Sequence, residues 1–500
     1  MKLDLHSIVS VTSIPAVRAL AISGALWLAI LVYSHYALWR NPHSAYFHSD
    51  NVYDLDYSIV RQTKGRDYLQ QYSNRSSPTD PAPPPPQHAD DTPTLCAAFA
   101  TVTRDHPEAA RYFSDSIGSM LVGLSPIERA SFNLTVLFAN SDPTIHKDFN
   151  APWLSALVDH AAGYEGISDE ERAELQRLEE AHDFQRKGVL DYIYLLDQCY
   201  RETRAPFIAV FEDDVIFAAD WLSRTILGLQ HLALPRDGHV LQPTPLDQPP
   251  WLYLRLFYTE THMMWENDDD WLYGHMFVAF GLAMFSTATV LLLIRQLLLQ
   301  NSNRSNTYTS KSWTLGLRLD IPTIAVLSVI VAPAFLGLFF MAGKYNLPMY
   351  TLQTSGVGAE ATQLADVGVF PMDKHGCCSQ GLVFNREQVP ALISYLQKRG
   401  RGQTDLMIEE YCNEAPLRRF ALGDQVIQHV GLISSRGQRN MGSQSVYAFY
   451  FEEKREQEVK KKQKVALGGI DWPMLKVLEA PETNNSRGIK QGLGILPPMI

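Results

Sequence analysis

The longest apolar stretches of the chain are three runs at residues 19–39, 272–294 and 321–342. A helix needs about 20 apolar residues to cross the hydrocarbon core of a bilayer, and none of these runs contains Asp, Glu, Lys or Arg. The first run predicts an uncleaved signal anchor, because it is longer than the apolar core of a cleaved signal peptide. The other two predict a transmembrane hairpin, for which a pair of buried core helices is the alternative.

The charges that flank the hairpin predict its orientation. The connection 295–320 carries four Lys or Arg residues and one Asp, whereas residues 256–271 carry five acids and no Lys or Arg. Because positively charged loops stay in the cytosol, we expect this connection and the amino terminus to be cytosolic and the carboxyl terminus to be lumenal. Candidate glycosylation sites in that topology are the lumenal Asn74, Asn133 and Asn484, and the cytosolic Asn303, which should stay unmodified.

Two polar segments are predicted to lie outside any folded core. Residues 40–93 end in the proline-rich stretch 76–93, which favours extended polyproline geometry and is predicted to form a stalk after the cytosolic tail 1–18 and the anchor. Residues 451–500 contain the charged run EEKREQEVKKKQK and are interpreted as a solvated charged face or a disordered tail.

Shorter apolar runs alternate with helical patterns after the stalk. Residues 95–104, 132–143 and 207–212 predict buried strands. Helical patterns occupy residues 108–120 and 168–203 between them. Strands that alternate with helices indicate an α/β fold with a parallel sheet and right-handed crossovers.

Capping signals mark the ends of the predicted helices. Ser168 and Glu171 have the spacing of a capping box, and Gly188 is a candidate break in the helix that follows. Gly400 is predicted to end a later helix, and Thr404 is predicted to cap the next one.

Further strands are predicted on both sides of the hairpin. Residues 249–260 precede it, and residues 376–385 and 424–435 follow it. Both flanks are lumenal in the predicted topology, so one domain can be completed across the insertion. The predicted parts are the domain segments 94–270 and 343–450 and the hairpin 271–342.

Charge and cysteine spacing argue against two kinds of ligand, nucleic acid and structural zinc. The formal charge of -11 and the pI near 5.8 leave no broad basic surface, which argues against nucleic acid. The five cysteines contain no CxxC pair, which argues against a structural zinc site. Pairing of the adjacent Cys377 and Cys378 with each other is less favoured than pairing of either with Cys412, Cys199 or Cys96. In an oxidising lumen such a disulfide would staple their loop, and the connectivity stays open.

Three adjacent carboxylates, Glu212, Asp213 and Asp214, follow the third predicted strand. Carboxylates at such a junction repel one another and resist burial, so they need a cation or a proton. At the end of a parallel strand they are suited to a divalent metal that carries a diphosphate. A solvated turn is the alternative.

The combination of a signal anchor, a Glu-Asp-Asp triplet and a membrane hairpin inside one domain resembles the Golgi post-GPI-attachment N-acetylgalactosamine transferase family, over residues 19–451. The stretches LDYIYLLDQCY, TDLMIE and IQHVGLISS are also similar to the N-acetylglucosaminyltransferase IV group. The resemblance implies an α/β, Rossmann-like domain of the glycosyltransferase-A type. The transmembrane hairpin would separate its nucleotide-sugar half from its acceptor half.

The resemblance also implies a site for manganese. Asp214 would bind the metal, and Glu212 and Asp213 would contact the ribose or complete the metal shell. His429 would supply a further metal or diphosphate contact, and a histidine satisfied at a strand edge is the alternative.

A uridine diphosphate sugar is the implied donor. Thr103 and Arg104, after the first strand, would help to hold the uridine diphosphate, although Arg104 is open to the alternative of a surface cation. Gly376 and Gly381 bracket the stretch GCCSQG and would let the backbone approach the sugar.

An inverting transfer needs a carboxylate that accepts the proton of the attacking hydroxyl. Asp405 and Glu409 lie four residues apart in TDLMIEE and therefore on one helix face. Asp405 is preferred because the start of the helix is expected to point into the crevice. Glu409 and Glu410 are the substitutes, with surface salt bridges as their alternative role.

These expectations describe a multi-pass Golgi membrane enzyme whose catalytic domain is lumenal. It would move N-acetylgalactosamine from UDP-GalNAc to the mannose core of GPI anchors, in a metal-dependent and inverting reaction. The hairpin would hold the crevice near a lipid-anchored acceptor. The alternatives are a related transfer, such as UDP-GlcNAc to N-glycans, and a non-catalytic membrane scaffold with a degenerate transferase domain.

Overall fold

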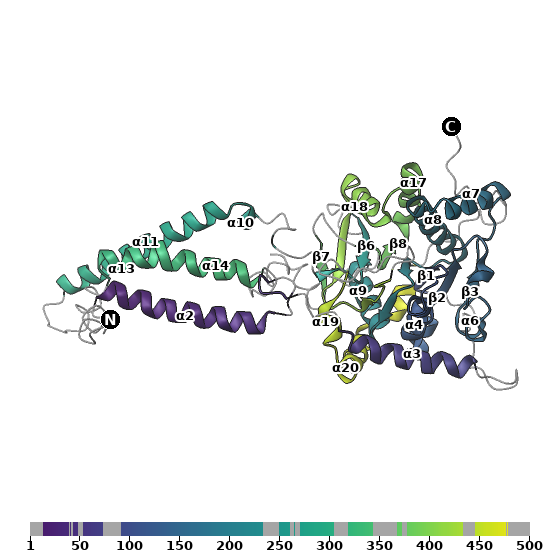
Figure 1. Cartoon of the computed structure of the whole chain (residues 1–500), viewed down its shortest axis with the longest axis horizontal. Helices are drawn as coiled ribbons and strands as arrows, with labels where there is room; N and C mark the ends of the chain where they lie inside the picture. The colour runs from purple at the N-terminus through teal and green to yellow at the C-terminus, as the bar shows by residue number, and fades with distance from the viewer. Residues whose placement is uncertain are drawn as a thin grey trace. The chain divides into compact units, whose positions relative to one another are not determined.

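The computed structural model divides into two compact units, each assembled from two stretches of the chain (Figure 1). Residues 1–52 and 261–352 form the helical unit, and residues 53–260 and 353–500 form the sheet unit. The structure describes residues 14–39, 41, 44–48, 54–73, 92–233, 250–260, 265, 271–304, 319–343, 368–372, 378–433, 446–476 and 478. Asn74, Gly376, Cys377, Asn484 and most of the proline-rich stretch lie outside these ranges, and of Asn303 only the backbone is described.

Within the described ranges, three helices of the helical unit are long and apolar enough to cross a membrane. This finding confirms the prediction of a transmembrane protein. The first helix begins at Pro15 rather than at residue 19, because proline suits the first turn of a helix. The helices are α2 (Pro15–Ala37), α11 (Met276–Arg304) after the short α10 (Trp271–Gly274), and α13 (Ile321–Val326), which continues through the π-helical η5 (Leu327–Val331) into α14 (Ala332–Ala342).

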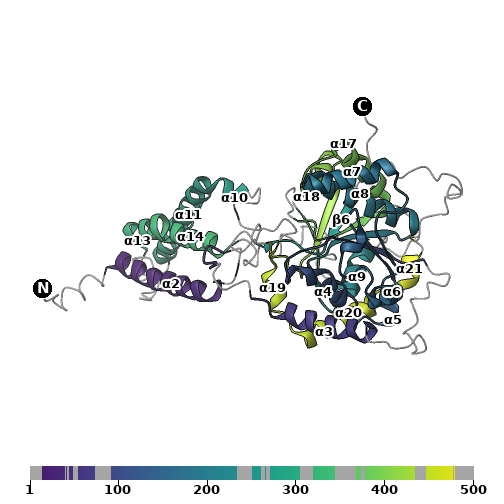
Figure 2. The ribbon, with the colours of Figure 1, turned by 45° about the vertical axis from the view of Figure 1, so that its right-hand side comes forward.

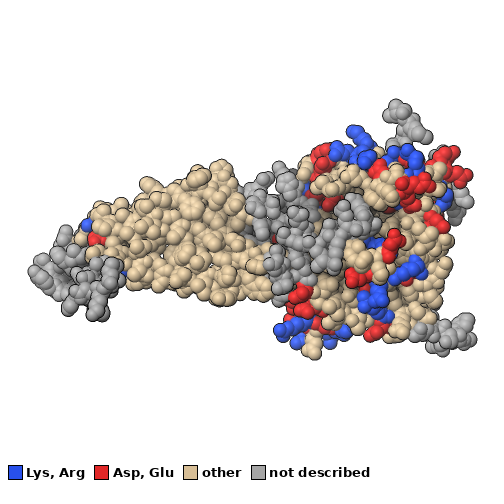
Figure 3. Space-filling model, viewed as in Figure 1, with Lys and Arg blue, Asp and Glu red and all other residues tan. Residues whose placement is uncertain are grey.

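The three membrane helices pack side by side in both views (Figure 1, Figure 2). Trp27 Nε1 on α2 donates a hydrogen bond of 2.9 Å to the carbonyl of Ala334 on α14. Only 6%, 6% and 17% of the residues in their most apolar windows are buried. On the face seen in Figure 3, the described charged side chains of this unit lie only near one end. Exposed apolar surface of this kind suits lipid, so the alternative of buried core helices is wrong.

The sheet unit contains an eight-stranded sheet with the order β3-β2-β1-β4-β8-β6-β9-β7. The neighbours β3, β2, β1 and β4 are parallel, as the alternation of strands and helices predicted. However, β8 runs antiparallel to β4 and β6, and β7 runs antiparallel to β9, so the sheet is mixed. The bounds are β1 (Leu95–Thr101), β2 (Phe132–Phe138), β3 (His160–Ala162), β4 (Phe207–Glu212), β6 (Trp251–Arg255), β7 (Val369–Pro371), β8 (Gly381–Asn385) and β9 (Arg418–Leu422).

Strands from both sides of the membrane insertion are neighbours in this sheet. β6 precedes residues 261–352 in the chain and β8 follows them, and the two strands pair with Tyr253 opposite Phe384. A second, two-stranded sheet joins β5 (Val215–Phe217) to β10 (Ile427–His429). Its register sets His429 opposite Val215, directly after the acidic triplet.

Helices cover both faces of the large sheet (Figure 1, Figure 2). Alternate residues of β1 point to opposite faces, as strand geometry requires, so Phe99 packs in one core and Ala98 in the other. One face carries α3 (Tyr57–Ser73), α4 (Tyr112–Leu121), α6 (Pro152–Leu157), α9 (Trp221–Ala233) and α20 (Glu456–Gly469). The other carries α7 (Asp169–Glu180), α8 (Phe184–Glu202), α17 (Val389–Arg399) and α18 (Thr404–Glu414). Shorter helices are η1 (Ala109–Arg111), α5 (Pro126–Ala130), η2 (Pro143–Ile145), η7 (Arg386–Gln388), α19 (Phe449–Glu452) and α21 (Trp472–Lys476).

The structure confirms two of the predicted helix ends and corrects two others. Ser168 and Glu171 form the predicted capping box at the start of α7, and Gly400 ends α17 in a left-handed conformation with φ of 68°. The break after α7 lies next to His182, which has φ of 53°, and not at Gly188, which is inside α8. Thr404 is the first residue of α18 and not its cap, which is Gln403.

Cysteine pairing differs from the expectation. Cys96 on β1 forms a disulfide with Cys199 on α8, which ties the sheet to a covering helix. Cys412 is a free, buried thiol, and Cys378 is disulfide-bonded. Cys378 therefore pairs with none of the three cysteines that the sequence offered for it.

Parts of both polar segments pack on the sheet unit. Docking of α3 corrects the assignment of residues 40–93 to a stalk, whereas α20 has the solvated charged face that was one interpretation of the charged run. Arg61 on α3 is 1% exposed and donates to the carbonyls of Phe217 at 2.9 Å and Ser119 at 2.6 Å. In the charged run, Val459 and Ala466 are buried on the inner face of α20. Their helical spacing explains how so polar a sequence docks, because its charges occupy the outer face.

Candidate functional site

The acidic triplet lies where β4 ends. Glu212 is the last residue of β4, and Asp213 and Asp214 form the turn into β5. Both aspartates are buried, so their charges need partners. Arg104 Nη2 donates to Asp213 Oδ1 and lies 3.4 Å from Asp214 Oδ2. Arg104 is therefore part of the positive charge that the triplet requires, and it is not a surface cation.

His429 supplies a second positive group. Its Nδ1 lies 2.9 Å from the carbonyl of Val446 and therefore carries a hydrogen, so Nε2 faces Asp214 Oδ2 at 3.6 Å. Burial favours the neutral ring, but the charge of Asp214 outweighs it and raises the pKa of His429 to about 9. Although burial favours the protonated acid, His429 and Arg104 lower the pKa of Asp214 well below its usual value. His429 and Asp214 are thus brought together as an ion pair.

Gly431 is a site residue that the sequence reasoning missed. A Cβ atom on this glycine would lie 2.6 Å from Asp214 Cγ and 2.7 Å from His429 Nε2. Both distances are far inside van der Waals contact, so a side chain at this position would displace the pair. The signal in the sequence was a glycine two residues after the candidate histidine.

Asp213 is held by a chain of hydrogen bonds that the sequence did not reveal. Thr101 Oγ1 donates to Asp213 Oδ2 at 2.8 Å and lies 3.1 Å from His146 Nε2. His146 Nδ1 accepts from the amide of Asp148, so its Nε2 carries the hydrogen that is donated to Thr101. Burial lowers the pKa of His146 to about 4 and keeps the ring neutral. Asp213 is therefore fixed on one oxygen by Thr101 and on the other by Arg104.

The ends of β1 and β2 also meet at the site. The amide of Thr103 donates to Asn140 Oδ1 at 2.9 Å, which connects the segment after β1 to the segment after β2. Thr103 Oγ1 is buried and has no hydrogen-bond partner among the described residues. The segment after β1 thus joins Asn140, which follows β2, to Arg104, which contacts the triplet.

A cavity of about 280 Å³ opens beside the triplet. The cavity is lined by Glu212, Gln380 and Asp405 and by residues at the start of α8. It is also lined by Val446, whose carbonyl accepts the hydrogen bond from His429 Nδ1. Ser379 Oγ donates to Glu212 Oε1 at 2.7 Å. Burial, followed by repulsion from Asp214, raises the pKa of Glu212 to about 7.

The three candidate bases of α18 have different surroundings. Asp405, in the first turn, lines the cavity and is partly exposed. Glu409 is buried and accepts hydrogen bonds from Tyr253 and Arg255, each at 2.5 Å, and from Arg419. Glu410 is exposed and pairs with Arg399 at 2.5 Å. This arrangement favours Asp405, because the carboxylate of Glu409 is already taken up by two arginines.

Gly381 has a packing role that was not expected. A Cβ atom there would lie 2.6 Å from Ile427 Cδ1, so the space beside this glycine is filled by β10 and not by open cavity. Gly376 lies outside the described ranges.

The described residues offer two groups that fit a divalent cation. Asp214 Oδ1 is buried without a hydrogen-bond partner in the described part of the chain, and His429 Nε2 lies beside the same carboxylate. These two atoms would be a suitable donor pair for manganese once His429 Nε2 has released the proton that it carries in the ion pair. Glu212 is instead turned to Ser379 and Gln380. No cluster of three or more His, Cys, Asp or Glu residues that could hold a metal occurs among the described residues, so other ligands would have to complete the shell.

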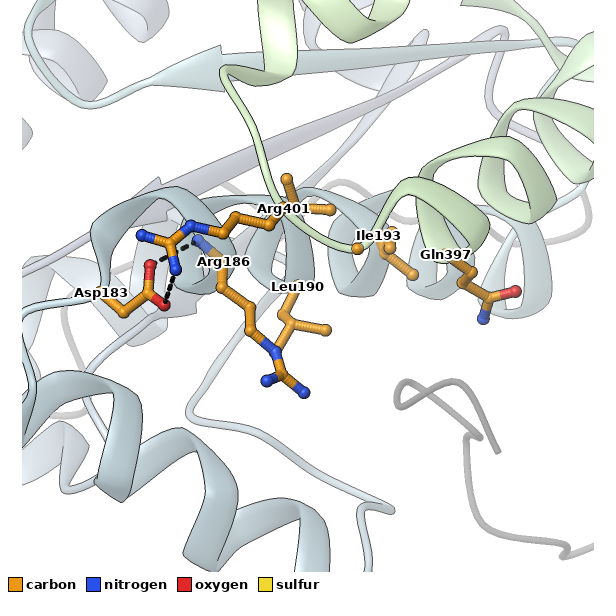
Figure 4. A pocket seen from close by; sticks show the side chains of 8 residues that line it. Asp183, Arg186, Leu190, Ile193, Gln397 and Arg401 are labelled. Atoms are coloured by element: carbon orange, nitrogen blue, oxygen red, sulfur yellow. Dashed lines mark hydrogen bonds and ion pairs between the residues drawn. The ribbon is translucent and has the colours of Figure 1, made fainter. Parts of the chain in front are cut away.

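A second cavity of about 270 Å³ lies between α8 and the connection from α17 to α18 (Figure 4). Its polar groups pair with each other, since Arg401 Nη1 lies 3.1 Å from Asp183 Oδ2. Its floor is apolar, with Leu190 and Ile193. No member of the triplet lines this cavity, so we do not treat it as the candidate site.

Comparison with known proteins adds no family to this description. No protein-family model matches the chain, and no curated protein matches it significantly.

Proposed function

We propose that the protein is a metal-dependent, inverting glycosyltransferase of the glycosyltransferase-A type that acts in the Golgi lumen. It would transfer N-acetylgalactosamine from UDP-GalNAc to the mannose core of GPI anchors. One observation carries the proposal: segments far apart in the chain bring Glu212 and Asp405 to one cavity. Val446 also lines this cavity and lies 2.9 Å from His429 Nδ1, and the Nε2 of His429 faces Asp214.

Asp214 and His429 are the residues that would hold manganese. The bound ion would neutralise the charge of the departing diphosphate. Arg104 and Thr101 fix Asp213, so its carboxylate keeps one orientation. Such pre-organised groups lower the orientational part of the barrier.

Asp405 is the proposed base. The oxygen of an acceptor hydroxyl would form a bond to the anomeric carbon while the bond from that carbon to the diphosphate oxygen breaks. The hydroxyl proton would pass to Asp405, and uridine diphosphate would leave with the bonding electrons. Attack on the opposite side of the anomeric carbon inverts its configuration.

The membrane helices support the choice of acceptor. A chain with three candidate spans is confined to the bilayer, and a lipid-anchored acceptor diffuses in the same plane. Shared confinement raises the effective concentration of the two partners. A GPI glycolipid fits this condition better than a soluble glycan does.

The test uses the full-length chain in lipid nanodiscs with manganese, a GPI-type acceptor and a panel of UDP-sugars. We expect turnover with UDP-GalNAc, its loss on chelation, and a loss of about 100-fold or more in Asp214→Asn and Asp405→Asn. Glu410→Gln on the exposed face of the same helix is the matched control and should keep the parent rate.

Three outcomes would contradict parts of the proposal. Turnover of UDP-GlcNAc on N-glycans would change the donor and the acceptor. Binding of UDP-sugars without any turnover would favour the scaffold. An Asp405→Asn variant as active as the parent would remove Asp405 as the base.

A further inference from the structure

Gln380 is a buried side chain of the cavity that the proposed reaction does not yet use. It precedes β8, and its carbonyl accepts a hydrogen bond of 3.4 Å from the amide of Glu212. This bond continues the β4–β8 ladder by one position, so the sheet itself sets Gln380 beside the triplet. Its side chain lines the cavity and is 8% exposed.

The amide of Gln380 has one satisfied end and one unsatisfied end. Nε2 lies 3.4 Å from Glu212 Oε2, toward which it donates. Oε1 is buried and accepts no hydrogen bond from the residues that the structure describes. When Glu212 is ionised, the reverse orientation of the amide would bring its oxygen against a carboxylate oxygen, so ionised Glu212 favours Oε1 on the far side.

Buried amide oxygens are nearly always hydrogen-bonded in folded proteins, and exceptions call for a physical reason. Glu212 and Asp405 in the same cavity are acceptors when ionised and cannot satisfy another acceptor. A ligand that carries O–H or N–H groups can satisfy all three. Sugars have this chemistry, because their ring hydroxyls and acetamide groups are hydrogen-bond donors.

We infer that Gln380 Oε1 accepts a hydrogen bond from the donor sugar and makes Gln380 a residue that recognises the transferred hexosamine. The inference rests on the proposed function, because it assumes that a UDP-sugar occupies this cavity. The donor atom is the acetamide N–H or a ring hydroxyl. Glu212 holds the amide in the orientation that this contact needs.

The test measures equilibrium affinity of the full-length chain in nanodiscs for UDP, UDP-GalNAc and UDP-galactose, with manganese present. In Gln380→Leu we expect affinity for UDP-GalNAc to fall by about fivefold to tenfold, the size of one neutral hydrogen bond, while affinity for UDP stays unchanged. An unchanged affinity for UDP-galactose would identify the acetamide, and an equal fall would identify a hydroxyl. Gln397→Leu, on α17 at the second cavity, is the matched control and should bind all three ligands as the parent does.

Thermal stability separates recognition of the sugar from a structural role. Oε1 has no partner in the described chain and Nε2 makes only a long contact of 3.4 Å with Glu212, so Gln380→Leu should lower the melting temperature of the ligand-free protein only slightly. If this variant does not fold, Gln380→Met keeps an unbranched side chain for the same measurements. A lower melting temperature with unchanged sugar preference would overturn the inference.

The remaining outcomes distinguish the inference from the function. Equal losses for UDP and UDP-GalNAc would show that Gln380 acts through the nucleotide, which overturns the inference and leaves the proposed function in place. A parent chain that binds none of the ligands would remove the proposed function, and the inference with it.

Discussion

At the scale of single residues, the site is a set of buried charges that hold one another in position. Asp214 lies between Arg104 and His429, and Asp213 is fixed by Arg104 and Thr101. Because these groups are shielded from water, moving one of them leaves a partner without compensation. A small change near the triplet should therefore disturb the geometry of the whole set.

Gly431→Ala tests how tightly this set is packed. The new methyl group would fall within 2.7 Å of His429 Nε2 and push it away from Asp214. We expect turnover to drop by about 100-fold, the effect of a displacement of roughly 1 Å at a reacting centre, with the chain still folded. Gly468→Ala is the control, since nothing lies within 4 Å of its added methyl group on α20. Wild-type turnover in Gly431→Ala would show that the pair tolerates displacement.

Glu260 gives a pH-dependent contribution to stability. Burial raises the pKa of this carboxyl to about 8, although the amide of Phe449 and the side chain of Gln425 donate to it. The folded chain thus keeps a proton that the unfolded chain releases near pH 4.5, so this contribution to stability decreases as pH rises from about 4.5 to 8.

The expected signature is a difference between two melting curves. In Glu260→Gln the contribution is absent, so the melting temperature of the parent relative to the variant should fall steadily between about pH 5 and 8. Melting temperatures of both proteins in the same detergent check this, and parallel curves would contradict the raised pKa.

At the scale of elements, the sheet unit includes two helices that lie before and after its alternating strands and helices in the chain. These helices are α3 and α20. α3 crosses α4 closely, because Gly65 and Gly118 let the two backbones approach, and an added Cβ on either would come within 3 Å of the other. Arg61 inserts from α3 toward the carboxyl end of α4 and pairs with Glu456 of α20 at 3.6 Å. The segments before and after the core are therefore tied to each other as well as to the sheet.

Arg61→Ala should destabilise the sheet unit. It leaves the carbonyls of Ser119, Val122 and Phe217 without the guanidinium donors that they use now. Buried acceptors without partners predict a loss of about 2–4 kcal/mol in the free energy of unfolding, measured by denaturant titration. Lys64→Ala on the same helix removes an ion pair of 2.7 Å between an exposed lysine and Glu456 and should stay within about 1 kcal/mol. Equal effects of the two changes would argue against the docking of α3 through Arg61.

At the scale of the whole molecule, the membrane segments and the sheet are interleaved along the chain. Residues 261–352 belong to the helical unit, yet β6 before them pairs with β8 after them. The sheet can close only after both halves have been synthesised. Folding of the sheet unit therefore depends on a long-range contact that forms after the second and third membrane helices.

Glycosylation tests the predicted topology. If the connection 295–320 is cytosolic, Asn303 receives no glycan, so Asn303→Gln should not change the electrophoretic mobility of the chain from secretory membranes. Asn74→Gln removes a predicted lumenal acceptor and is the matched comparison. A glycan on Asn303 would reverse the orientation of the hairpin.

Local patterns of apolar residues in the sequence were sufficient to predict much of the fold. The apolar runs identified the membrane helices, and β1, β2 and β4 begin where their apolar stretches begin. Reversal of β8 was not predictable, because strand direction depends on a partner far away in sequence. Docking of α3 was missed for the same reason, since the polar residues of this helix include a buried arginine that satisfies distant carbonyls.

For the candidate site, sequence placed the triplet at a strand end and Asp405 at the start of a helix, and the structure has both there. It kept Glu409 as a substitute for Asp405, because helical spacing indicates a shared face but not what lies against each turn. The arginines from β6 and β9 that surround Glu409 are assigned only by the sheet.

The sequence by itself therefore determined which segments are apolar enough for lipid and where polar groups follow strands, because composition and periodicity are local properties. Only the tertiary structure decided that His429 faces Asp214, that Gly431 leaves room for them and that Gln380 lacks a partner for one oxygen. These facts depend on distances between residues far apart in the chain, and such distances are set by strand pairing and packing.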